Sequence, residues 1–150
     1  MLHFEKTSWI DAAPPVVWRF YERPDILTLI TPPWQPVEVV RREGGLGVGA
    51  ESEFRIWLGP IPVTWVAVHT HCQAPDRFVD VQKSGPMEFW QHQHFFIAER
   101  GGTTLVDKID FSLPGGDMAE FLLGGWIKER LSDMFDYRHQ VTREACAGKM

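Results

Sequence analysis

The stretch Glu88–Leu113, EFWQHQHFFIAERGGTTLVDKIDFSL, carries most of the information about the fold. Side chains of different character alternate on both sides of Gly101-Gly102, which is typical of two β-strands joined by a tight turn. The pattern predicts strands over Glu88–Ala98 and Thr103–Leu113. Because the connection is only a few residues long, the two strands are expected to pair antiparallel as a hairpin.

The same period of two residues extends upstream of the hairpin. Each run ends at a short connection rich in Gly or Pro, such as Gly44–Gly49, Gly59–Pro62 and Ser84–Pro86. Such connections favour a meandering antiparallel sheet. The further strands predicted in this way are residues 2–10, Val37–Arg42, Ser52–Leu58, Val63–Cys72 and Arg77–Lys83.

Helical spacing of apolar residues appears in three places. Pro14 and Pro15 suit the first turn of a helix, and a second short helix is predicted over Asp25–Ile30. Residues 117–145 carry a long helical pattern with Asp117 as the expected N-cap and Gly124-Gly125 as a weak point. The predicted fold class is α+β, because one sheet with an apolar face must bury it against the long helix.

Length and composition limit the function. A chain of 150 residues is expected to form one domain over 1–150, and its net charge of −5 argues against nucleic acid as a partner. Residues 1–6 show no signal peptide pattern, and no window is apolar enough for a transmembrane segment. The two cysteines, Cys72 and Cys146, make no disulfide framework, so a cytoplasmic location is expected.

Several motifs give the chain a recognisable pattern. They are Ala13–Trp18, Leu29–Trp34, Phe78–Gln82, Gly85-Pro86, Trp90–Phe96, Gly101–Thr103 and Phe135–Arg138. Together with the element order they resemble the START-like superfamily, also called SRPBCC or helix-grip, and within it the bacterial polyketide cyclase/dehydrase-like branch. The resemblance implies a curved antiparallel sheet of about seven strands wrapped around the long C-terminal helix, two short helices after the first strand, and an internal ligand cavity.

Successive residues of a strand point to opposite faces of the sheet. Choosing the odd- or the even-numbered residues of a strand as the inner set therefore assigns the side chains that would line this cavity. The family pattern W-x-H-x-H-x-F favours the even-numbered residues of 88–98 as the inner set. With the inward residues of the other elements, the predicted ligand-binding residues are Trp34, Phe54, Ile56, Trp65, His69, Phe78, Asp80, Gln82, Trp90, Phe96, Ile109, Phe121, Leu122 and Trp126.

A polar streak interrupts this aromatic lining. The hairpin brings His94 near Asp107, with His92 beside them, and these three are the candidate catalytic residues. An Asp oxygen that accepts from a His N–H fixes the tautomer and raises the His pKa, as a positioned acid or base requires. Two other interpretations stay open: the groups satisfy one another in a core, or they orient a ligand.

Two H-x-H pairs, His69-x-His71 and His92-x-His94, invite a metal interpretation. Their strands flank the 77–83 strand and so lie about 9–10 Å apart. A tetrahedral site with Zn–N near ~2 Å needs closer ligands. No metal and no cofactor is therefore predicted.

Three function classes remain. The first is a binding protein for a small hydrophobic molecule, such as a lipid, because small-molecule pockets are built from apolar and aromatic side chains with few polar groups. The second is a cyclase or dehydratase that uses His92, His94 and Asp107 for proton transfer. The third is a partner-binding module with a collapsed cavity, whose surface patch forms a homodimer.

Overall fold

A computed structural model describes residues 1–58 and 60–149 of the chain, so Gly59 of the predicted 59–62 connection lies outside the described residues. The elements follow the predicted order. They are β1 (Leu2–Ile10), α1 (Pro14–Tyr21), α2 (Ile26–Ile30), β2 (Val37–Glu43), β3 (Glu51–Leu58), β4 (Ile61–Gln73), β5 (Arg77–Ser84), β6 (Phe89–Glu99), β7 (Gly102–Ser112) and α3 (Gly116–Cys146).

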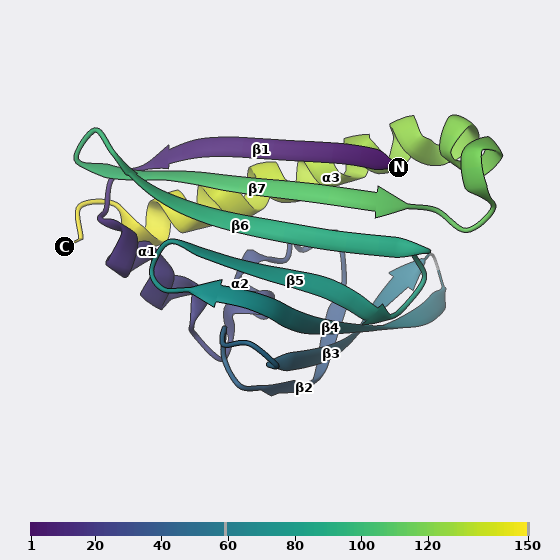
Figure 1. The fold of residues 1–150 in the computed structure, drawn as a ribbon, viewed down its shortest axis with the longest axis horizontal. Coiled ribbons are helices and arrows are strands. Elements are labelled where there is room, and N and C mark those ends of the chain that lie inside the picture. Colours follow the sequence, from purple (N-terminus) through teal and green to yellow (C-terminus); the bar gives the residue numbers. More distant parts are fainter. Residues whose placement is uncertain (59, 150) are drawn as a thin grey trace.

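The strands form one antiparallel sheet in the order β1-β7-β6-β5-β4-β3-β2, which confirms the predicted meander (Figure 1). Only β1 departs from sequence order, since it pairs with β7 at one edge. The predicted hairpin is β6–β7, in which His94 lies opposite Asp107 and Trp90 opposite Phe111. The sheet and the long C-terminal helix confirm the α+β, helix-grip architecture.

The long helix α3 packs along β1 and β7, while α1 and α2 pack against α3 (Figure 1). We call the side of the sheet that faces α3 the inner face. Two hydrophobic clusters fill this layer: one around α1, Phe78 and Phe96, and one around Ile109, Phe111 and Phe135. Among the described helices, none has the length and apolarity needed to cross a lipid bilayer.

Two local expectations need correction. Asp117 lies in the first turn of α3 rather than at its N-cap, which is Gly115 with a left-handed φ of 98°. The left-handed backbone is where Gly has no steric penalty, so the turn after Leu113 selects it over Asp. Strand β4 begins at Ile61, inside the segment predicted as a connection, because Ile61 and Pro62 pair with the end of β3.

Candidate functional site

The even-numbered residues of β6 lie on the inner face. His92, His94 and Phe96 are buried and Trp90 is half-buried, while Phe89 and Ile97 of the odd set are exposed. Trp90 packs against the cluster that contains Leu131 and Phe135 of α3. Along one strand the inner face therefore passes from aromatic to imidazole and back to aromatic, with the polar residues in the middle.

Asp107 of β7 is the centre of the polar residues. Its Oδ1 lies 2.7 Å from Nε2 of His92, and its Oδ2 lies 2.5 Å from Nε2 of His139 on α3. His139 is held in turn by Ser8 of β1, whose Oγ is 2.8 Å from its Nδ1. Nδ1 of His94 is 3.2 Å from Asp107 Oδ1 but makes no hydrogen bond within the described residues. One carboxylate thus joins the sheet to the helix.

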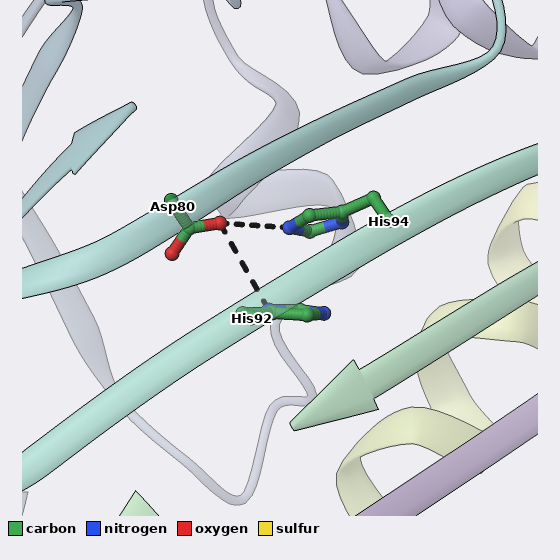
Figure 2. A group of neighbouring side chains, drawn as sticks. All are labelled: Asp80, His92 and His94. Carbon is green, nitrogen blue, oxygen red and sulfur yellow. Dashed lines mark hydrogen bonds and ion pairs between the residues drawn. The ribbon is translucent and has the colours of Figure 1, made fainter. Parts of the chain in front are cut away.

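A second carboxylate, Asp80 of β5, completes the network (Figure 2). Its Oδ2 lies 2.7 Å from Nε2 of His94 and 4.0 Å from Nδ1 of His92. The two imidazole rings stack with their centroids 3.6 Å apart. Asp80 and Asp107 therefore approach the pair of histidines from neighbouring strands on either side of β6.

The pKa shifts follow from this arrangement. Burial alone would raise the pKa of Asp107, but hydrogen bonds from His139 and His92 outweigh it and hold that pKa well below its usual range. The pKa of Asp80 is also lowered: burial opposes the shift, and the hydrogen bond with His94 outweighs burial.

The two neighbouring histidines are shifted in opposite directions. Burial lowers the pKa of His92, and the neighbouring His94 lowers it further. For His94 burial also opposes the charged form, but Asp107 and Asp80 together outweigh it and raise the pKa. The pKa of His94 is therefore raised, as expected for the histidine beside Asp107, while the pKa of its neighbour His92 is lowered.

An arginine and a tyrosine also approach the network. The guanidinium of Arg138 lies over the Phe135 ring at 5.0 Å, and its buried Nε has no hydrogen-bond partner in the described residues. Burial lowers the pKa of Arg138, although the charges of Asp107 and Asp80 oppose that shift. Tyr21 hydrogen-bonds Thr142 through Oη at 3.0 Å, and burial raises its pKa.

Beside the polar network an aromatic row crosses the inner face. Phe54 stacks on Trp65 with ring centroids 6.0 Å apart, Trp65 meets Trp90 edge-on at 5.0 Å, and Trp90 contacts Phe111 at 5.6 Å. Phe54, Ile56 and Trp90 remain half-buried. These side chains are not fully covered because α3 packs along β1 and β7, toward the opposite edge of the sheet from β3.

Other predicted lining residues have structural partners of their own. Phe78 and Phe96 belong to the cluster around α1, and Ile109 to the cluster under α3. His69 Nδ1 lies 3.0 Å from the carbonyl of Leu46, and its pKa is lowered by burial. Gln82 binds both backbone groups of Met87 and so holds the β5–β6 turn.

The predicted helix residues do not reach the inner face. Phe121, Leu122 and Trp126 are 84%, 67% and 59% exposed, so their expected place inside a cavity is wrong. An α-helix has 3.6 residues per turn, so Ile127 and Gly124 lie on the same side of α3 as the buried Leu131. Gly124 is buried and Ile127 is half-buried. Trp126 is turned by about 100° from Ile127 and points away from the sheet.

Trp34, another predicted ligand-binding residue, is 62% exposed and meets Tyr137 of α3 edge-on at 5.6 Å. It lines an open hollow of about 420 Å³ with Gln35, Pro36 and Trp57. A second open hollow, of about 410 Å³, lies over the β2–β3 turn. The enclosed cavity that the resemblance implied is neither of these.

Sequence reasoning missed His139, Ser8 and Arg138 as members of the network. His139 lies four residues after Phe135 and eight after Leu131, so it continues the buried stripe of α3. That spacing could have identified it as an inward side chain. Ser8 is separated from His139 by most of the chain, and no local pattern marks it.

These features define a helix-grip domain with a buried histidine–carboxylate network beside an aromatic row. A family profile described as polyketide cyclase / dehydrase and lipid transport matches residues 10–136. The chain therefore belongs to this family. No curated protein sequence matches it.

Solved structures agree with this assignment of the fold. Protein TTHA0849 from Thermus thermophilus superposes with a TM-score of 0.73 at 18% identity, covering 95% of this chain and 94% of that one. Protein Ms6760 from Mycobacterium smegmatis gives 0.74 at 16% identity, covering 99% and 93%. A nucleoside-diphosphate sugar epimerase from Corynebacterium glutamicum gives 0.68 at 26% identity, covering 94% of this chain but 28% of that one.

Proposed function

We propose that this protein binds a small, largely hydrophobic molecule between the inner face of the sheet and α3. The observation that carries the proposal is the aromatic row, in which Phe54 and Trp90 remain half-buried beside Trp65. Large aromatic surfaces that the fold leaves partly uncovered are suited to an apolar ligand. The polar network next to them supplies groups that orient such a ligand.

The family supports this coarse function, since its description includes lipid transport. The open hollow beside Trp34 is a competing place for the same ligand, because two tryptophans, Trp34 and Trp57, line it. Phe54 and Trp57 are both on β3, and odd and even positions of a strand point to opposite faces. Substitution of Phe54 therefore tests binding at the inner face, and substitution of Trp57 tests binding in the open hollow.

The test is a panel of fatty acids, isoprenoids and polycyclic aromatic compounds, measured by thermal shift and by quenching of tryptophan fluorescence. At a ligand concentration of 100 times the dissociation constant, binding stabilises the folded state by about 2.7 kcal/mol. We expect Phe54→Ser to weaken binding of the active compound at least about tenfold, which corresponds to ~1.4 kcal/mol.

Trp57→Ala is the matched control and should leave that affinity unchanged. The proposal fails if no compound shifts the melting temperature. It also fails if Trp57→Ala abolishes binding while Phe54→Ser does not, because the ligand then occupies the open hollow.

A second candidate is a cyclase- or dehydratase-type enzyme, favoured by the tautomer that Asp107 imposes. When Nε2–H of His92 donates to Asp107, Nδ1 is left with a free lone pair and can accept a proton. The reaction step would be removal of a proton from the carbon next to a ligand carbonyl. His94 and Asp80 would hold the ring of His92 in place.

This candidate is tested by exchange of acidic C–H protons for deuterium in a panel of β-keto compounds, followed by NMR. His92→Gln should abolish exchange, while the exposed His71→Gln retains it. Exchange at the rate of buffer alone, with wild-type protein, removes the enzyme interpretation and leaves the binding proposal standing.

A further inference from the structure

Asp80, His92 and His94 place three metal-ligating atoms on two neighbouring strands. One atom of each residue lies within 4.8 Å of the others, and the side chains converge in one place (Figure 2). The β5–β6 register sets Asp80 opposite His92, and the H-x-H spacing puts His94 on the same face. The strand between the two H-x-H pairs thus provides the third donor, which the spacing of the histidines alone does not reveal.

The second ring nitrogens of His92 and His94 have the kind of partner that is typical of metal-binding histidines. Histidine ligands usually donate their second ring N–H to a carboxylate, which fixes the ring and its tautomer. Here His92 has Nε2 2.7 Å from Asp107 Oδ1, and His94 has Nδ1 3.2 Å from the same oxygen. Asp107 is itself held by His139. Both remaining ring nitrogens therefore face one anchored carboxylate.

His94 supplies an independent observation. Its Nε2 hydrogen-bonds Asp80, while its Nδ1 is buried and has no hydrogen-bond partner in the described residues. A buried polar nitrogen without a partner is costly. If a cation took the place of the proton between Nε2 and Asp80, Nδ1 would carry the ring proton, 3.2 Å from Asp107 Oδ1. Rotation of the ring would then give Nδ1 the hydrogen bond that the metal-free network lacks.

We propose that Asp80 Oδ2, His92 Nδ1 and His94 Nε2 form a binding site for a first-row divalent transition metal ion, with Zn²⁺ as its representative. Two imidazoles and one carboxylate suit such ions better than Mg²⁺ or Ca²⁺, which prefer oxygen ligands. Bond lengths of about 2.0–2.2 Å in a tetrahedral site place the donors about 3.3–3.5 Å from one another. Asp80 Oδ2 and His94 Nε2 must therefore move apart from 2.7 Å, while His92 Nδ1 approaches Asp80 from 4.0 Å as its ring turns out of the stack with His94. Side-chain rotation provides both movements, so the strands need not shift.

The experiment uses untagged protein, stripped of metal with a chelator and titrated with Zn²⁺ in competition with a chromogenic chelator. One equivalent of Zn²⁺ should bind. Asp80→Asn and His94→Gln should each weaken binding at least about tenfold, and Asp107→Asn by about 10–100-fold as the group behind the ligands. The control is His71→Gln, an exposed histidine of the neighbouring strand β4 that lies outside the three ligands and should bind as wild type does.

A measurement on the wild type alone covers the case in which a variant fails to fold. In NMR spectra of the imidazole protons, Zn²⁺ should shift the His92 and His94 signals in slow exchange and leave those of the exposed His3 and His71 in place. The proposal is overturned if wild-type protein binds no equivalent of Zn²⁺. It is equally overturned if folded Asp80→Asn binds normally, or if only the exposed histidines shift.

Discussion

The two halves of α3 belong to one helix and have opposite surroundings. In the C-terminal half about one residue per turn is buried, namely Leu131, Phe135, His139, Thr142 and Cys146. In the N-terminal half Gly124 is buried, while the large apolar side chains of Met118, Phe121, Leu122, Leu123 and Trp126 are exposed. The N-terminal half, whose sequence is the more apolar, therefore buries fewer of its side chains.

The difference comes from what lies opposite each half. Val141, Ala145 and Cys146 pack with the residues of α1 and α2, so the C-terminal half has sheet on one side and helices on another. The N-terminal half meets the start of β1, where Gly124 lies against Leu2 and Glu120 pairs with the N-terminus. Apolar composition thus does not decide burial, because a side chain is buried only where another element covers it.

Removing one aromatic ring from each half should give the largest contrast between them. Phe135→Ala should lower the free energy of unfolding by about 3–5 kcal/mol, because it opens a cavity between β1, β6 and α3. Phe121→Ala should change it by less than about 0.5 kcal/mol. Urea denaturation measures both, and an equal loss in the two variants would show that the N-terminal half is packed in solution.

The polar contact of the C-terminal half gives the next largest effect. His139→Leu removes the hydrogen bond to the buried Asp107 and should cost about 1.5–3 kcal/mol, because bonds to charged groups are the stronger ones. The control is His3→Leu, which breaks the pair of His3 with Asp110 at a side chain that is 70% exposed. That pair should contribute no more than about 1 kcal/mol. Chemical denaturation at neutral pH compares the two, and equal losses would contradict a special role for the buried pair.

The smallest effect concerns the two glycines of the N-terminal half. A Cβ added at Gly125 meets nothing within 4 Å, so Gly125→Ala should raise the free energy of unfolding by about 0.5–1 kcal/mol through helix propensity. A Cβ at Gly124 would lie 3.3 Å from two methyl carbons of Leu2, so Gly124→Ala should gain less. Thermal unfolding of the two variants decides this, and destabilisation by Gly125→Ala would mean that this face is covered.

Most of the fold could be predicted because half-buried antiparallel strands leave a period of two in the sequence. The hairpin around Gly101-Gly102 also set the register, so Asp107 could be placed beside His94 from the sequence alone. The helix faces were harder. Residues 117–130 carry apolar side chains on several sides, and nothing local shows which side meets the sheet.

Some residues of the candidate site could also be predicted from the sequence, and others could not. His92, His94 and Asp107 were found because they lie on two strands joined by a short turn. The role of Asp80 as a partner of His94 needed the β5–β6 pairing, and that of His139 needed α3 to dock on the sheet. Ser8 comes from the far edge strand, whose place beside β7 is a long-range contact.

The amino-acid sequence alone establishes the order of the strands and helices and the hairpin register. Both depend on periodicity and turn length, which act between residues close along the chain. Alternation also places His92 and His94 on one face, but the choice of the inner face came from the resemblance to the family pattern. Tertiary packing settles that Asp107 takes its hydrogen bonds from His92 and His139, and that α3 turns Leu131 rather than Trp126 toward the sheet. The physical reason is that the way α3 docks depends on which apolar surface the other helices and strands leave uncovered, and no single stretch of sequence contains that information.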